Sequence, residues 1–120
     1  MTQKELGDYG EDLAVDYLQG RGYCVIERNF KNKLGEVDII AKDKGTLCFI
    51  EVKTRESQKF GSPFEYVTPA KQKQIAKMAT SYLQLKDLDD VKARFDVVAV
   101  TLDQESSGQI ELMKNAFEMG

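Results

Sequence analysis

Two short apolar segments near the middle of the chain carry charged residues that could do metal-dependent chemistry. Asp38 interrupts the first, GEVDIIA, while Glu51 and Lys53 interrupt the second, FIEVKTR. Carboxylates are poor strand formers and are rarely buried without a partner. Mg²⁺ prefers oxygen ligands, commonly one or two carboxylates together with water and substrate phosphate. The pattern therefore indicates a site at which Asp38 and Glu51 hold a divalent cation.

The chemistry expected of such a site is hydrolysis of a phosphodiester bond. Mg²⁺ or Mn²⁺ lowers the pKa of a bound water and offsets charge on the scissile phosphate. Lys53 shares a strand face with Glu51, because side chains alternate along a strand, and is a candidate to orient that water or stabilise the transition state. The backbone carbonyl of Val52 and the carboxylate of Glu11 are candidates for further metal ligands.

The register of the two segments decides whether the carboxylates meet. We expect a hairpin of strands over residues 36–41 and 46–54. A loop of two or four residues pairs position 38 with position 51 and places their Cβ atoms about 5 Å apart. Two unpaired carboxylates at that spacing repel by roughly 3 kcal/mol at an effective dielectric constant near 20, and a cation between them reverses the sign. A three-residue loop without a bulge puts Asp38 on the opposite face.

Two amphipathic helices are expected to position this hairpin. Thr2 and Glu5 have capping-box spacing at the start of a helix over residues 2–19, and Glu11 lies near the edge of its apolar stripe. A second helix over residues 68–86 begins with Thr68 and Pro69, which suit the N-cap and the first helical position.

The remaining segments predict three more strands, over residues 23–30, 93–102 and 109–114. A polar, basic connection is expected over residues 29–34, and a loop containing Phe60, Phe64 and Tyr66 over residues 56–67. The order α-β-β-β-α-β-β indicates an α/β fold with a mixed sheet of about five strands flanked by helices. In the second strand of the hairpin, the face formed by Cys48, Ile50 and Val52 is expected to be the stronger core face.

Composition bounds the class of protein. The chain has 120 residues, room for one domain, and no histidine. Without histidine there is no Ser-His-Asp triad and no His-ligated zinc, and two distant cysteines, both expected to be buried thiols, cannot build a zinc site. No apolar run is long enough to span a membrane, and no signal-peptide pattern is present, so a cytoplasmic protein is expected.

Charge is unevenly distributed along the chain. The net charge is −3, yet residues 28–77 hold 11 basic and 6 acidic residues, a balance of +5, and the rest balances to −8. An anionic partner would be steered to the basic segment, which contains the unusual carboxylates. The nucleic-acid-binding candidates are Lys31, Lys33, Arg55, Lys71 and Gln72. The competing interpretation is a solvated surface on which lysines gather by chance.

The sequence also resembles a known family. The matching segments are LGDYGEDLAVDYLQGRGY (6–23), ERNF (27–30), GEVDIIA (35–41), FIEVKTR (49–55), FGSPFEYV (60–67) with Lys71 after it, and RFDVVAV (94–100). They resemble the YraN-like family of small bacterial proteins, which is similar to archaeal Holliday-junction resolvases and to the PD-(D/E)xK nuclease superfamily. Together these segments extend through nearly the whole chain.

The resemblance implies a restriction-endonuclease-like core and a Mg²⁺-dependent endonuclease acting on DNA. By this resemblance, Glu11 matches the acid on the first helix of the resolvases, Asp38 matches the superfamily Asp, and Glu51 and Lys53 match its (D/E)xK. The proline that gives the superfamily its name is replaced by Val37, as it often is in resolvases. The resemblance also implies a homodimer, although no pattern in the chain marks a dimer face.

Three functions compete at this stage. The first is a metal-dependent endonuclease acting on structured DNA. The second is a nucleic-acid-binding module with the same fold and no nuclease activity, and the third is a protein-interaction domain. The joint presence of Glu11, Asp38, Glu51 and Lys53 favours the first, because a binding module has no need of carboxylates that repel phosphate.

Overall fold

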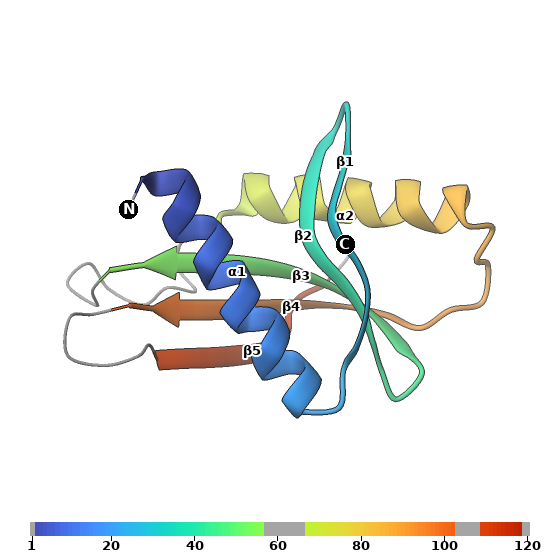
Figure 1. Ribbon diagram of the computed structural model, residues 1–120. Helices are drawn as coiled ribbons and strands as arrows, with labels where there is room; N and C mark the ends of the chain where they lie inside the picture. The colour runs from blue at the N-terminus through green and yellow to red at the C-terminus, as the bar shows by residue number, and fades with distance from the viewer. Residues whose placement is uncertain (1, 57–66, 103–108, 119–120) are drawn as a thin grey trace.

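A computed structural model describes residues 2–56, 67–102 and 109–118, and the predicted order of elements is confirmed (Figure 1). The aromatic side chains expected in the loop over residues 56–67 lie outside this description. The elements are α1 (Gln3–Gly20), β1 (Cys24–Asn32), β2 (Gly35–Asp43), β3 (Thr46–Arg55), α2 (Pro69–Leu85), β4 (Ala93–Thr101) and β5 (Gln109–Phe117).

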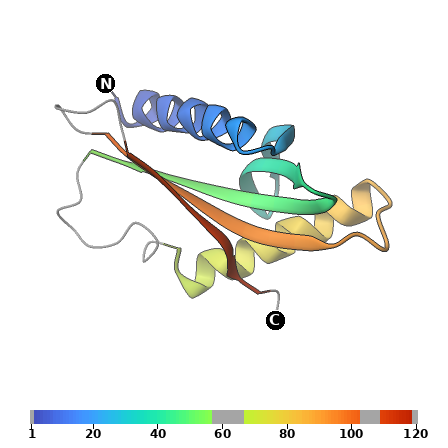
Figure 2. The ribbon, with the colours of Figure 1, turned by 90° about the horizontal axis from the view of Figure 1, so that it is seen from below.

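The five strands form one mixed sheet in the order β1-β2-β3-β4-β5. Neighbouring strands are antiparallel except β3 and β4, which are parallel and are connected through α2. Figure 2 shows α1 on one face of the sheet and α2 on the other. The α/β class and the mixed, helix-flanked sheet agree with the prediction. No helix in the described part of the chain has the length and apolar character needed to cross a bilayer.

Both helices begin as their sequences predict. Thr2 and Glu5 form a reciprocal capping box at the start of α1, and the Thr68 hydroxyl accepts a hydrogen bond from the amide of Lys71 at the start of α2. α1 ends before Gly22, whose φ of +93° suits glycine. The buried stripe of α1 includes Ala14 and Leu18, and Glu11 is buried on the same helix.

Both faces of β3 are buried, which corrects the expectation that one face dominates. Leu47 and Phe49 pack in the core under α2, and Cys48 and Ile50 pack in the core under α1. The four side chains are at most 1% exposed. β3 is a central strand of a sheet covered on both sides, so each face must be apolar until the strand reaches Glu51.

The β1–β2 connection is shorter than predicted. β1 continues to Asn32 and β2 begins at Gly35, so only Lys33 and Leu34 form the turn. The polar stretch is a strand because Phe30 anchors one of its faces against Tyr82 of α2, with ring centroids 5.2 Å apart. A second correction concerns the thiols, which are both free, with Cys48 buried as expected but Cys24 exposed.

Candidate active site

The register of β2 and β3 places the two central carboxylates at neighbouring positions. The strands pair from Asp43 with Thr46 to Ile39 with Ile50, around a two-residue turn of Lys44 and Gly45. Both turn residues have positive φ, 51° and 86°, as a tight hairpin turn requires. The even loop on which the site depends is therefore confirmed, and the next positions in this register are 38 and 51.

At Asp38 the strand β2 turns away from β3. Val37 packs in the core under α2, whereas Ile39, two residues later, packs in the core under α1, so the backbone twists between them. The carboxylate of Asp38 accepts a hydrogen bond from the amide of Val52 at 2.8 Å. The side chain thus satisfies a β3 amide at the end of the β2–β3 ladder. This explains how a carboxylate is tolerated inside an otherwise apolar strand.

Glu51 is buried with an incomplete set of partners. Its side chain is 6% exposed, and its Oε2 has no hydrogen-bond partner among the residues that the structure describes. The nearest cation is Lys71 of α2, whose Nζ lies 3.7 Å from that oxygen. An ion pair at this distance leaves the carboxylate oxygen able to take a closer ligand.

The electrostatics of the pair disfavour two negative charges. Burial and then the charge of Glu51 raise the pKa of Asp38 to about 7, while the amide of Val52 acts in the opposite direction. Burial likewise raises the pKa of Glu51, opposed by the charges of Lys71 and Lys53. The two carboxyl groups lie within hydrogen-bonding reach of each other. Near neutral pH, they are best accommodated by a shared proton or by a cation.

Glu11 lies beside this pair but is held by other residues. Its carboxylate accepts hydrogen bonds from Nε of Arg28 at 2.9 Å and from Nδ2 of Asn29 at 3.1 Å. Burial raises the pKa of Glu11, Arg28 opposes this, and the nearby charge of Asp38 adds to it. Arg28 also bonds Asp12 at 2.7 Å, so it joins two acidic residues of α1 to the sheet.

A cleft of about 360 Å³ lies beside Asp38 and Glu11, and buried Glu51 is not part of its lining. Its lining includes Glu11 from α1, Asp38 from β2 and Lys53 from β3. α1 lies close to the end of β3 at Gly10, where any Cβ would collide with the side chain of Thr54. Glycine at this position is therefore what allows Glu11 to line the same cleft as Asp38 and Lys53.

The donor set fits a hard divalent cation. Asp38 and Glu51 provide carboxylate oxygens, one of them the orphaned Oε2 of Glu51, and Mg²⁺ commonly takes only one or two carboxylates. Within the described ranges, no group of three or more acidic or cysteine side chains is arranged to hold an ion. Ligation by Glu11 and by the carbonyl of Val52 stays a prediction.

The predicted nucleic-acid-binding residues are spread over two elements and the end of a third. Lys31 pairs with Glu36 at 3.6 Å, Lys33 is in the β1–β2 turn, and Arg55 ends β3. Lys71 forms an ion pair with Glu51. The side-chain amide of Gln72 donates a hydrogen bond to the backbone carbonyl of Val67 at 3.0 Å. The structure therefore brings Lys71 to the carboxylate pair and places Lys31 and Lys33 on the hairpin.

Sequence reasoning missed three residues that build this site, Gly10, Arg28 and Asn29. Glycine inside an otherwise regular helix was an available signal for Gly10, since it lowers helix stability unless close packing requires it. Asn29 has a φ of 55°, a conformation that asparagine tolerates better than most residues. The contact of Arg28 with Glu11 joins residues 17 apart and had no local signal.

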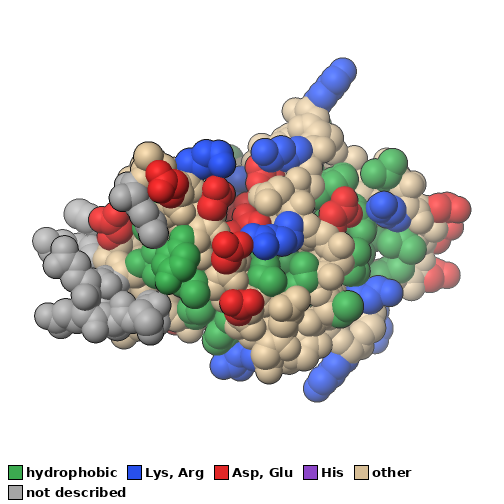
Figure 3. All heavy atoms as spheres, in the orientation of Figure 1, with side chains coloured by type: hydrophobic (Ala, Val, Ile, Leu, Met, Phe, Trp, Pro, Cys, Tyr) green, Lys and Arg blue, Asp and Glu red, His purple; other side chains and the backbone are tan. Residues whose placement is uncertain are grey.

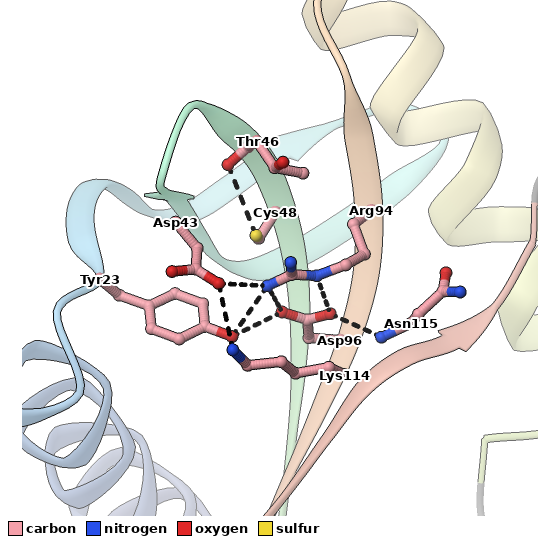
Figure 4. Close-up of polar contacts among 8 residues, drawn as sticks. All are labelled: Tyr23, Asp43, Thr46, Cys48, Arg94, Asp96, Lys114 and Asn115. Carbon is pink, nitrogen blue, oxygen red and sulfur yellow. Dashed lines mark hydrogen bonds and ion pairs between the residues drawn. The ribbon is translucent and has the colours of Figure 1, made fainter.

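A second buried polar network lies near the opposite end of β3 (Figure 4). Asp96 is fully buried and accepts hydrogen bonds from Arg94 at 2.8 Å, from the Tyr23 hydroxyl at 3.0 Å and from the Asn115 amide at 2.9 Å. Arg94 also donates to Asp43 at 2.9 Å. Its hydrogen bond is the main cause that lowers the pKa of Asp43. This network is neutralised from within, unlike the pair at Asp38.

Comparison of the sequence with those of known proteins identifies a family. Residues 10–100 match the model of the uncharacterised protein family UPF0102. The chain is 52% identical over 116 residues to a UPF0102 protein of Geotalea uraniireducens, covering 97% of this chain and 91% of the relative. It is 49% identical over 120 residues to one of Syntrophus aciditrophicus, covering 99% and 94%. With one of Clostridium botulinum the identity is 48% over 118 residues, covering 97% and 96%.

Proposed function

The chain belongs to the uncharacterised protein family UPF0102, which confirms the resemblance to YraN-like proteins, and we propose that it is a metal-dependent endonuclease. Its substrate would be DNA, including branched DNA, and its reaction the hydrolysis of a phosphodiester bond. The observation that carries this proposal is the pair formed by half-buried Asp38 and buried Glu51, in which an oxygen of Glu51 has no hydrogen-bond partner among the described residues. Mg²⁺ or Mn²⁺ is the cofactor proposed for the pair.

A cation at this pair would turn an unfavourable arrangement into a favourable one. Two close carboxylates repel when both are ionised. Burial raises the pKa of both groups, and the charge of Glu51 raises that of Asp38 further. A bound divalent cation would supply Lewis acidity at the phosphate and a more acidic water. Asp38 and Glu51 would hold it, with phosphate and water completing its ligands.

The chain's own cations would handle the substrate. Lys53 lines the cleft beside Asp38, so its ammonium can contact a phosphate oxygen there and stabilise charge that develops in the transition state. Lys71 is near Glu51 and would shift its ammonium toward a phosphate once Glu51 is otherwise neutralised. Glu11, held by Arg28 and Asn29, would orient water or a ligand from the opposite wall of the cleft.

The second candidate is a nucleic-acid-binding protein of the same fold that does not cut. The contact between Lys71 and Glu51 favours it, because this lysine partly neutralises the buried carboxylate without any metal. The two candidates share a substrate and differ only in whether the carboxylates act on it. A cleavage assay therefore separates them.

The decisive assay incubates supercoiled, linear and four-way-junction DNA with the protein in Mg²⁺ or Mn²⁺. We expect the wild type to cut at least one substrate and Glu51→Gln to lose at least about 100-fold in rate, as for loss of a group essential to transition-state stabilisation. Glu111→Gln, on the exposed side of β5, is the matched control and should cut normally. If the wild type binds DNA in every metal and cuts none, the binding candidate replaces the nuclease.

A further inference from the structure

The turn between β1 and β2 presents an apolar side chain at an outer edge of the molecule. Figure 1 shows this hairpin rising past α2 and away from the rest of the sheet. Leu34 forms the turn with Lys33 and is 48% exposed. Single exposed leucines are ordinary, so the feature acquires meaning only from how the turn is held and what surrounds it.

Side chains fix the backbone of this turn from below. Oδ1 of Asn32 accepts a hydrogen bond from the backbone amide of Leu34 at 2.8 Å, and Nδ2 of Asn32 donates one to the hydroxyl of Ser81 at 3.1 Å. Nε2 of Gln74 donates to the carbonyl of Leu34 at 2.9 Å. A Cβ at Gly35 would collide with Gln74, so glycine lets the turn rest directly on α2. Both backbone polar groups of Leu34 are thus satisfied, and the turn is preorganised.

Positive charge predominates around the turn, although Glu36 of β2 forms an ion pair with Lys31 at 3.6 Å. Lys31 and Lys33 flank the tip, and α2 beneath it has three lysines and no acidic residue. α1, on the other face of the sheet, has five acidic residues and a single lysine, and Figure 3 shows acidic side chains along it. The molecule therefore has a basic side, formed by α2 and the hairpin, and an acidic side. Charge complementarity selects a polyanion for the basic side.

We propose that the β1–β2 turn is a wedge that recognises an unpaired or unstacked base in DNA. Leu34 packs against the face of that base, and Lys31, Lys33 and the lysines of α2 contact the flanking phosphates. Apolar side chains that enter a base step are a known means of reading deformable DNA, while phosphate contacts only fix position. The inference rests on the proposed function for its partner, and it adds a substrate class, which is a duplex interrupted by an unpaired base.

The geometry also places the cut. Leu34 and Asp38 are four positions apart on one extended segment, which spans at most about 13 Å at 3.3 Å per residue. Successive phosphates of one strand of B-DNA advance about 3.4 Å along the helix axis per nucleotide. The scissile bond should therefore lie within about four nucleotides of the unpaired base.

Binding is measured in Ca²⁺ by fluorescence anisotropy, with a perfect duplex and with the same duplex carrying one unpaired 2-aminopurine. We expect the wild type to prefer the interrupted duplex about tenfold, and Leu34→Ala to lose that preference while keeping its affinity for the perfect duplex. Gln74→Ala, which frees the turn, should reduce the preference in part. Met113→Ala, a similarly exposed apolar residue on β5, is the control and should keep it. The 2-aminopurine emission should change on binding only when Leu34 is present.

The outcomes separate this inference from the nuclease proposal. Equal preference and equal emission for wild type and Leu34→Ala would overturn the wedge, even if the protein cuts DNA. A preference that depends on Leu34 would support the wedge, even if no DNA is ever cut. Absence of any DNA binding by the wild type would overturn the wedge as well.

Discussion

Two aspartates of the sheet, half-buried Asp38 and fully buried Asp96, each accept a hydrogen bond from a backbone amide, but the charges around them differ. Asp38 accepts a hydrogen bond from the amide of Val52, where the pairing of β2 with β3 ends. Asp96 accepts one from the amide of Asn115, where the pairing of β4 with β5 shifts. Asp96 is surrounded by Arg94 and the hydroxyl of Tyr23. Asp38 instead faces Glu51.

The difference teaches how to tell a structural carboxylate from a candidate functional one in this molecule. Burial alone does not distinguish them, because Asp96 is the more deeply buried. What distinguishes them is the balance of charge within hydrogen-bonding reach. The Asp96 network contains its own cations at hydrogen-bond distance. The Asp38 pair has a surplus of negative charge at that distance, because Lys71 lies 3.7 Å from Glu51 and Lys53 acts on it through its charge. Such a surplus is tolerated where a cation can enter.

The largest expected effect is on the neutralised network. Arg94→Ala leaves Asp96 and Asp43 buried without their main cation, and should lower the free energy of unfolding by about 3–5 kcal/mol. Chemical denaturation in urea measures this loss. Lys42→Ala, on an exposed part of β2, is the control and should change stability by less than about 0.5 kcal/mol. A similarly small loss for Arg94→Ala would mean that the network does not stabilise the fold.

The second substitution, at Asp38, should raise the free energy of unfolding rather than lower it. Asp38→Asn keeps an oxygen for the Val52 amide and removes the repulsion of Glu51, so it should stabilise the metal-free protein by about 1–2 kcal/mol. The same substitution should abolish cleavage. Urea denaturation in EDTA, together with the cleavage assay, measures both changes. Destabilisation by Asp38→Asn would remove the contrast between the two aspartates.

The pH dependence of stability should also differ between the two regions. The pKa of Asp38 is raised from its ordinary value of 3.8 to about 7, so the folded state binds its proton more tightly than the unfolded state. Stability of the metal-free protein should then fall as pH rises from about 4 to about 8. Asp43 has a lowered pKa, so the stability it contributes should be lost as pH falls below its ordinary pKa. Melting temperatures across pH for wild type and Asp38→Asn test this. The fall between pH 4 and 8 should become smaller in the variant, with the remainder due to Glu51 and Glu11, whose pKa values burial also raises.

A further effect concerns the packing of α1 at the wall of the cleft. Gly10→Ala should push α1 away from Thr54, at a cost of about 1–3 kcal/mol, and move Glu11 relative to Asp38. Cleavage should fall more than stability accounts for, because the positions of two cleft residues change together. Gly7→Ala is the matched control, since a Cβ at Gly7 meets nothing within 4 Å. Equal behaviour of the two variants would show that close packing at Gly10 is unimportant.

The sequence predicted what depends on local patterns. Alternation along residues 36–54 predicted the hairpin but left loops of two, three or four residues open. The two-residue turn at Lys44 and Gly45 sets a register in which 38 and 51 are the positions after the pair of Ile39 and Ile50. Capping residues predicted where both helices begin. Lys71, near the start of α2, was identified as a candidate from position and charge, and it is the lysine that contacts Glu51.

The rest depends on contacts between distant parts of the chain. Glu11 was expected on a solvated edge of the helix or as a metal ligand. In the structure, its carboxylate accepts a hydrogen bond from Arg28 on β1. The Asp96 network joins residues of β2, β4 and β5 to Tyr23, just before β1, and nothing in the stretch RFDVV indicates it. The turn at Lys33 and Leu34 was missed because a polar, basic stretch suggests a loop unless its packing on α2 is known.

Metal binding tests the central claim most directly. Titration calorimetry with Mn²⁺ should show binding to the wild type and to Glu111→Gln. It should also show at least about tenfold weaker binding to both Asp38→Asn and Glu51→Gln, each of which loses a carboxylate ligand. Equal Mn²⁺ affinity in all four proteins, or no binding to the wild type at millimolar metal, would contradict the assignment of this carboxylate pair as a metal centre.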